Sequence, residues 1–278
     1  MDWCTGLIGS AIIAGAAFWK KALTLDGSIA AIAVGTLVYA LGTPAWYGTL
    51  IAFFVSSTLL SRWRKKEKSA VETKYAKTGK RDAGQVLANG GAATLACVLS
   101  AAFPHPAILM FYVGAIAAVN ADTWATEIGP LSRRSPRSIL TGQPVERGTS
   151  GGITAAGVLA SATGSVFIAS VALLLGGKEM LTEIHLSSSL MYASVAFIFI
   201  GLVAGVAGSL ADSLLGASLQ AVYRCPVCHK NVEHSEHCGK PGQLIRGLKR
   251  MNNDVVNFIA SLVGGMVGVV FYALLLYA

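Results

Sequence analysis

Long apolar stretches recur along the whole chain, and they restrict its fold more than any other feature of the sequence. Each is close to the length that crosses a hydrocarbon core of roughly 30 Å. Backbone N–H and C=O groups find no water inside a bilayer, so spanning segments of this kind must be helical. A mean hydropathy of +0.59 and only 13% charged residues agree with a membrane protein. The stretches are 4–19, 24–42, 45–61, 83–103, 107–122, 153–176, 190–212 and 254–277.

The sequence therefore predicts an all-α fold, a polytopic membrane helix bundle of seven to eight transmembrane helices that forms one integral membrane domain over 1–278. The first and fifth stretches are short, so each is either a span or an interfacial or re-entrant segment. Asp2 follows Met1 where a signal peptide would carry basic residues. We therefore expect the first stretch to be a retained span.

Basic residues are confined almost entirely to loops on one side of this bundle. Segments 20–26, 62–82, 126–150 and 220–251 hold 21 of the 22 lysines and arginines, and only Lys178 falls on the other side. The positive-inside rule makes these elaborated loops cytoplasmic and both termini external. Topology and contact with anionic lipid headgroups explain the net charge of +8, so no nucleic-acid partner is expected. The active site is predicted at this cytoplasmic face.

Aspartates mark where this face carries chemistry. Asp82 and Asp254 open the fourth and eighth stretches, while Asp122 and Asp212 close the fifth and seventh, so four helices bring carboxylates to about one depth. One aspartate at a membrane boundary can simply face water, but four with amide neighbours favour an inward-facing site. Carboxylates near basic loops suit Mg²⁺ and a substrate that bears phosphate. The amide neighbours are Gln85, Asn89, Asn120, Asn252, Asn253 and Asn257.

The segment Asn120-Ala-Asp-Thr-Trp-Ala-Thr-Glu-Ile-Gly129 adds detail around Asp122. Ala125 and Gly129 lie at i+3 and i+7 from that aspartate, which leaves a strip of small residues where a backbone or a ligand can approach. Leu210-Ala-Asp-Ser-Leu-Leu-Gly216 repeats a shorter version of the pattern. Glu127 lies about 140° from Asp122 on a continuous helix, so the two carboxylates could not readily share one ion. Either the helix breaks near Thr126, which we favour, or Glu127 serves a second ion or the acceptor side.

The second cytoplasmic loop ends in the glycine-rich run Val145-Glu-Arg-Gly-Thr-Ser-Gly-Gly152 before the sixth stretch. Such a helix start exposes backbone N–H groups where the helix dipole favours an anion, which predicts a phosphate cradle. Plain helix capping is the alternative interpretation. The residues assigned to the nucleotide are Arg137, Glu146, Arg147, Gly148, Thr149, Ser150, Gly151 and Gly152.

The third loop carries Cys225-Pro-Val-Cys228, followed by His229, His234, His237 and Cys238. A Cys-x-x-Cys pair with a third cysteine and nearby histidines has the ligands of a structural tetrahedral Zn²⁺ site. A redox pair or unligated thiols are the alternatives. We predict Zn²⁺ at Cys225, Cys228, His237 and Cys238, folding the 225–238 loop within the membrane domain.

Four motifs together resemble the phytyl-phosphate kinase family of the tocopherol pathway, over nearly the whole chain. They are the runs from Asn120 and Val145 given above, Gln85-Val-Leu-Ala-Asn-Gly-Gly91 and Asn252-Asn-Asp-Val-Val-Asn257. This family is similar to the CTP-dependent phytol and dolichol kinases, whose Asp-x-x-Ala-x-x-x-Gly pattern is matched at Asp122, Ala125 and Gly129.

The resemblance implies transfer of the γ-phosphate of a nucleoside triphosphate, CTP favoured, to a prenyl monophosphate such as phytyl or geranylgeranyl phosphate. On this interpretation Mg²⁺ binds Asp122, Asp212 and Asp254, and Glu127, Asn120 and Asn253 complete the catalytic set. The lipid acceptor's head is assigned to Arg81, Asp82, Gln85, Asn89, Arg246 and Lys249.

Two other functions use similar features. A CDP-lipid cytidylyltransferase would use the same metal and nucleotide chemistry but release pyrophosphate. A lipid or anion transporter should carry its polar residues at the membrane midplane, whereas here they gather at one face.

Overall fold

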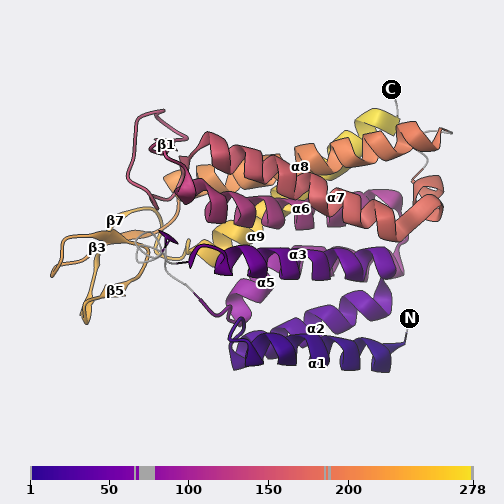
Figure 1. The fold of residues 1–278 in the computed structure, drawn as a ribbon, viewed down its shortest axis with the longest axis horizontal. Coiled ribbons are helices and arrows are strands. Elements are labelled where there is room, and N and C mark those ends of the chain that lie inside the picture. Colours follow the sequence, from indigo (N-terminus) through magenta and orange to yellow (C-terminus); the bar gives the residue numbers. More distant parts are fainter. Residues whose placement is uncertain (1, 66, 69–78, 185, 187–188, 277–278) are drawn as a thin grey trace.

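The computed structural model describes residues 2–65, 67–68, 79–184, 186 and 189–276, and its helices run side by side (Figure 1). Residues 66 and 69–78 of the first long basic loop, 62–82, therefore lie outside the described residues. Eight helices of 17 or more residues occur in the described ranges. They are α1 Trp3–Trp19, α2 Leu25–Leu41, α3 Pro44–Arg62, α5 Ala83–Ala102, α6 Pro106–Ile128, α7 Ala155–Glu183, α8 Leu190–Ser218 and α9 Asn253–Leu276.

Short antiparallel strands lie in the second and third loops, and a 3₁₀ turn, η1 Gly129–Leu131, follows α6. The strands gather at one end of the bundle, while both termini lie at the other end (Figure 1). β1 pairs with β2, β3 lies between β4 and β7, and β5 pairs with β6. Their bounds are β1 Arg137–Ser138, β2 Gly152–Ile153, β3 Val222–Arg224, β4 Asn231–Val232, β5 Glu236–His237, β6 Lys240–Pro241 and β7 Gln243–Arg246.

The helix starts follow from capping chemistry. Thr24 and Thr154 accept hydrogen bonds from the backbone N–H of Gly27 and Gly157, three residues on. Asp82 and Gln85 form a reciprocal capping box at the start of α5. Each cap satisfies a backbone donor that the first helical turn leaves without an intrahelical partner.

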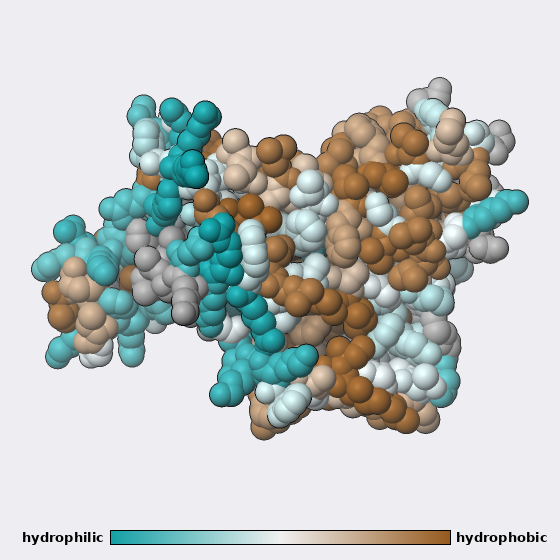
Figure 2. All heavy atoms as spheres, viewed as in Figure 1, coloured by the Kyte–Doolittle hydropathy of each residue, from teal (hydrophilic) through white to brown (hydrophobic). Residues whose placement is uncertain are grey.

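The predicted membrane helix bundle is confirmed, but the count of seven to eight transmembrane helices is not. Within the described residues, five helices are long and apolar enough to cross a membrane, namely α5, α6 with η1, α7, α8 and α9. The apolar helices α1 and α2 are shorter. Apolar side chains cover much of the helical body, and polar ones gather at the end with the strands (Figure 2). A bilayer would solvate side chains such as Leu174, which is 80% exposed.

α6 is the central helix, and it packs against α3, α5, α7, α8 and α9. The expected break near Thr126 is wrong, because α6 continues without interruption to Ile128. Threonine and glutamate are both compatible with a helix interior, and the first residue that ends the α-helical pattern is Gly129 before Pro130.

Glycine and alanine make the contacts between α6, α8 and α9 unusually close. A Cβ atom placed on Gly208 of α8 would lie 2.3 Å from the Cβ of Ala118 on α6. One placed on Gly264 of α9 would lie 2.5 Å from the same atom. Membrane helices associate through van der Waals packing, so small residues at the contact let the backbones approach.

The two ends of the bundle should lie on opposite sides of the membrane. Gly142 occupies an exposed turn of the second loop, and its Cα hydrogens face open space. An epitope inserted after Gly142 and another fused to the C-terminus should bind antibody in vesicles of opposite orientation. Detergent-opened vesicles, in which both epitopes must bind, are the control. Binding of both epitopes from one side of sealed vesicles would exclude this topology.

Candidate functional site

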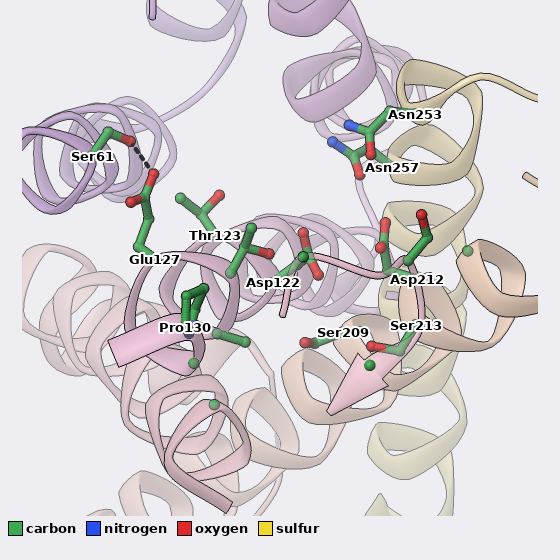
Figure 3. A pocket seen from close by; sticks show the side chains of 18 of the residues that line it. Ser61, Asp122, Thr123, Glu127, Pro130, Ser209, Asp212, Ser213, Asn253 and Asn257 are labelled. Carbon is green, nitrogen blue, oxygen red and sulfur yellow. Dashed lines mark hydrogen bonds between the residues drawn. The ribbon is translucent and has the colours of Figure 1, made fainter. Parts of the chain in front are cut away.

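A cavity of about 360 Å³ lies at the end of the bundle that carries the strands. Its walls come from the ends of α3, α5, α6, α7, α8 and α9 and from all three elaborated loops. Figure 3 shows its interior, where acidic, amide and hydroxyl side chains from α6, α8 and α9 face one space. The cavity therefore collects residues that lie far apart in the sequence.

Asp122 and Asp212 form the acidic centre of this cavity (Figure 3). They lie four residues after Ala118 and Gly208, a pair of small residues at which α6 and α8 approach closely. Residues four apart share a helix face, and both helices run toward the loop end, so the close contact places the two carboxylates side by side. The two Ala-Asp-Thr/Ser motifs of the sequence thus meet in space.

One oxygen of this pair is available to a ligand. Oδ2 of Asp212 is buried and has no hydrogen-bond partner within the described part of the chain. A buried carboxylate oxygen without a partner is costly unless a cation or a donor binds it. Asn253 and Asn257 of α9 lie across the cavity (Figure 3), and Nδ2 of Asn257 donates to Oδ1 of Asn89 at 3.3 Å.

Glu127 lies in the cavity wall but apart from the aspartate pair (Figure 3). Its Oε1 accepts from the hydroxyl of Ser61 at 2.6 Å, and Lys68 forms a salt bridge with its Oε2. The unbroken helix keeps Glu127 and Asp122 on different faces, as the 140° separation requires. Glu127 therefore connects α6 to the end of α3, and its carboxylate does not lie beside that of Asp122.

The glycine-rich segment 148–152 forms the wall next to α8. Gly151 has a φ of +81°, and a Cβ atom there would lie 2.3 Å from the Cβ of Ala217, so both conformation and space require glycine. Ser150 donates to Oε1 of Glu233 at 2.7 Å. The guanidinium of Arg147 donates to backbone carbonyls, at 2.7 Å to Ser132, and so holds the second loop in place.

Arg81 stands where the cavity meets a second, apolar groove. The groove has a volume of about 70 Å³, lies between α1, α2, α3 and α5, and shares Arg81, Gln85 and Asn89 with the cavity. The Arg81 guanidinium carbon lies 5.9 Å from the ring centroids of both Phe53 and Phe54. Burial lowers the pKa of Arg81 and the nearby carboxylate of Glu127 opposes that shift, but an arginine stays protonated in either case.

Several predicted site residues line the cavity and others do not. It brings together Asp122, Glu127, Asp212, Asn253, Arg81, Gln85, Asn89, Arg147, Gly148, Thr149, Ser150, Gly151 and Gly152. Two of the four predicted aspartates, Asp122 and Asp212, line the cavity, while Asp82 caps α5 and Asp254 lies in the first turn of α9, both outside the lining.

The remaining predicted residues have structural contacts of their own. Asn120 is fully buried below the cavity, where it accepts from Ser56 and donates to the carbonyl of Gly164. Arg137 donates to the carbonyl of Gly142, and Arg246 donates to that of Gly216 at the end of α8. Glu146 and Lys249 are exposed and do not line the cavity.

Glu233 is a cavity residue that the sequence analysis did not single out. It lies between the predicted zinc ligands Cys228 and His237. The sequence therefore places it in the third loop but does not predict its contact with segment 148–152. Only the folded loop shows that contact. The one available signal was its position as one of two acidic residues in that loop, the other being Glu236.

A second cluster lies in the third loop, outside the cavity lining. Ligand atoms of Cys225, Cys228, His237 and Cys238 all lie within 4.8 Å of one another. Among the described residues this is the only group of three or more histidines, cysteines or acids that could hold a metal ion. The aspartates of the cavity therefore offer a pair of ligands, not a closed cage.

Comparison with known proteins gives one family and several relatives. The family model described as integral membrane protein DUF92 matches residues 8–265. Protein PGR of Arabidopsis thaliana is 32% identical over 92% of this chain and 91% of its own. An uncharacterized membrane protein of Methanocaldococcus jannaschii is 33% identical over 81% of this chain and 76% of its own.

Protein VTE6, chloroplastic, also of Arabidopsis thaliana, is similar at lower identity. It is 26% identical over 89% of this chain, which covers 64% of that protein's length. No solved structure matches the chain.

The helix contact beneath the aspartates should tolerate no added volume. Gly208→Ala should lower the melting temperature in detergent, because overpacking typically costs about 1–3 kcal/mol. Gly15→Ala is the matched control, since Gly15 is also helical but has nothing within 4 Å of an added Cβ. That control should be neutral or slightly stabilising. Equal melting temperatures for both variants would show that the close contact does not constrain the fold.

Proposed function

This chain belongs to the DUF92 family of integral membrane proteins, and we propose that it is a magnesium-dependent prenyl-phosphate kinase. It transfers the γ-phosphate of a nucleoside triphosphate, CTP favoured, to a prenyl monophosphate such as phytyl or geranylgeranyl phosphate. One observation carries the proposal: a polar cavity with paired carboxylates and a glycine-rich wall meets an apolar groove at a half-buried arginine, Arg81. An acceptor with an anionic head and a hydrocarbon tail fits this junction of two environments.

The distribution of charge supports an active site at the cytoplasmic face. The described loops at the cavity end of the bundle belong to segments that carry 21 of the 22 basic residues of the sequence, and the positive-inside rule assigns such segments to the cytoplasm. On this topology both termini are external, and α1, α2 and α3 cross the membrane with the five longer helices. A nucleotide then arrives from the cytosol, while the lipid arrives from the bilayer.

Asp122 and Asp212 are the residues that would hold Mg²⁺. The ion prefers oxygen ligands and often binds one or two carboxylates together with substrate phosphates, and Oδ2 of Asp212 is a buried acceptor with no partner among the described residues. When bound, Mg²⁺ neutralises charge on the phosphates. Asp254 lies outside the lining, so this proposal assigns the ion to the pair alone.

The remaining chemistry requires positioning more than proton transfer. An oxygen of the acceptor phosphate forms a bond to the γ-phosphorus, the bond from that phosphorus to the bridging oxygen breaks, and the nucleoside diphosphate leaves with the electron pair. Because the acceptor is already an anion, no general base is needed. Backbone groups of 148–152 and the amides of Asn253 and Asn257 would bind the triphosphate, and Arg81 would bind the acceptor's head.

The apolar groove is the natural place for the first part of the prenyl chain. Its lining is mostly apolar, with side chains such as Ala31, Val34 and Leu50 from α2 and α3. The polar members are Ser10, Tyr47, Arg81, Gln85 and Asn89. A phosphate held at Arg81 would leave its tail against these residues, where burial of apolar surface contributes about 25 cal/mol per Å².

Loss of either aspartate should remove most of the activity. Asp122→Asn and Asp212→Asn should each lower turnover on the order of 10²-fold or more, the scale of a lost metal ligand. The measurement is labelled product formed from phytyl phosphate with CTP, UTP, ATP and GTP in nanodiscs. Glu67→Gln is the control, because Glu67 is an exposed carboxylate whose ion pair is with Arg64.

The identity of the products separates this function from its rivals. A kinase releases nucleoside diphosphate, whereas pyrophosphate release would instead identify a cytidylyltransferase. Near wild-type kinase activity in both folded aspartate variants across a magnesium titration would place the site elsewhere.

A bulky side chain in the groove should discriminate between acceptors by chain length. Ala31→Trp should raise the KM for phytyl phosphate about tenfold or more and leave that for a five-carbon prenyl monophosphate nearly unchanged, because only the long tail reaches the filled groove. Ala33→Trp, on an exposed part of α2, is the control. An equal effect of Ala31→Trp on both acceptors would exclude the groove as the tail site.

A further inference from the structure

The third loop contains two hairpins whose tips meet. β3 and β4 pair antiparallel on either side of the Cys225–Lys230 turn, and β5 and β6 pair on either side of Cys238 and Gly239. Cys238 and Gly239 both have positive φ, at 53° and 70°, which makes the second turn tight. The tips bring Cys225 and Cys228 from one hairpin against His237 and Cys238 from the other.

The first hairpin tip orients its sulfur atoms through the backbone. The N–H groups of Val227 and Cys228 lie 3.4 and 3.5 Å from the sulfur of Cys225 and donate to it. Such donation stabilises a thiolate, the form in which cysteine binds a metal. Cys225 is buried, and none of the described cysteines is in a disulfide.

The distances among the four ligand side chains suit one tetrahedral ion. Nδ1 of His237 lies 3.4 Å from the sulfur of Cys228 and 3.2 Å from that of Cys238. Tetrahedral Zn²⁺ with bonds of about 2.3 Å to sulfur and about 2.0 Å to nitrogen places its ligands roughly 3.5–3.8 Å apart. Only small side-chain movements separate the observed positions from that arrangement.

The segment between the two tips reaches the cavity. Glu233 follows β4 and precedes β5, and its carboxylate accepts a hydrogen bond from the hydroxyl of Ser150 at 2.7 Å. A crosslink between the hairpins would therefore fix the chain on both sides of Glu233. This contact connects the third loop to segment 148–152 in the cavity wall.

We propose that Cys225, Cys228, His237 and Cys238 bind one structural Zn²⁺, and that this ion holds Glu233 against Ser150. Four protein ligands close the coordination sphere, so the ion has no position for substrate and acts as a crosslink. Glu233 is a positioning residue, because it acts through Ser150 and the glycine-rich wall. The metal content and the structure of the third loop do not depend on whether the protein is a kinase.

Elemental analysis tests the ion directly. Protein purified in detergent without chelator should contain about one zinc per chain. Cys225→Ser and Cys238→Ser should lose it, whereas Cys97→Ser, a buried cysteine of α5, should keep it. Glu233→Gln should also keep it, since its carboxylate is not a ligand. Zinc-free wild-type protein, or full zinc in Cys225→Ser, would overturn the site.

Cobalt gives a readout that needs no variant to fold. Co²⁺ exchanged into wild-type protein should show the thiolate charge-transfer and strong visible bands of tetrahedral sulfur and nitrogen ligation. Their absence in fully reduced protein would count against the site, as would a Cys225–Cys228 disulfide found by mass spectrometry in protein purified under reducing conditions.

Hydrogen exchange tests the coupling to Glu233. Removal of zinc should speed amide exchange in 148–152, and Glu233→Ala should reproduce that increase with zinc still bound. Lys230→Ala, an exposed residue of the first hairpin tip, is the matched control and should not change it. Unchanged exchange in 148–152 after zinc removal would refute the coupling and leave only the metal site.

Discussion

The close approach of α6 and α8 at Ala118 and Gly208 is the constraint on which the functional end of the molecule depends. It brings Asp122 and Asp212 together one turn later and lets α9 pack into the same junction through Gly264. Further along α8, the same alignment puts Ala217 against Gly151, so the glycine-rich wall is fitted to the helix pair. The carboxylates and the wall that faces them are thus placed by one contact between small residues.

The cavity combines charges of both signs, which the proposed binding of a metal ion and phosphates would require. Its acidic members are Asp122, Glu127, Asp212 and Glu233, and its cationic members are Lys21, Arg62, Lys65, Lys68, Arg81 and Arg147. Some of these charges already have protein partners, as Lys68 and Glu127 show. The aspartate pair and Arg81 stand apart, because the former offers a buried oxygen and the latter lies against aromatic rings at the junction with the groove.

The sequence predicted the helices well because a bilayer leaves the backbone few alternatives. Every expected stretch corresponds to a helix. Asp122 and Asp212, which line one cavity, could be selected as candidates because carboxylates at helix ends are exceptional in such a chain. Helix rotation was harder to predict. Asp82 and Asn120 are polar residues at the expected depth. The side chain of Asp82, however, caps α5, and that of Asn120 is buried and donates to the carbonyl of Gly164. The groove beside Arg81 and the reach of Glu233 arise from tertiary packing, which no local pattern encodes.

The seam between α6 and α8 has a further consequence for variation in the chain. It accommodates one methyl group, that of Ala118, where Gly208 supplies none. A Cβ atom added at position 208 would also lie 3.0 Å from the carbonyl oxygen of Ala260 on α9 and 3.2 Å from the Cα of Ala118, and both of these backbone atoms remain when Ala118 becomes glycine. The two positions are therefore not interchangeable, and Ala118→Gly should relieve only part of the destabilisation caused by Gly208→Ala. The backbone of α9, and not the Ala118 methyl alone, requires glycine at position 208.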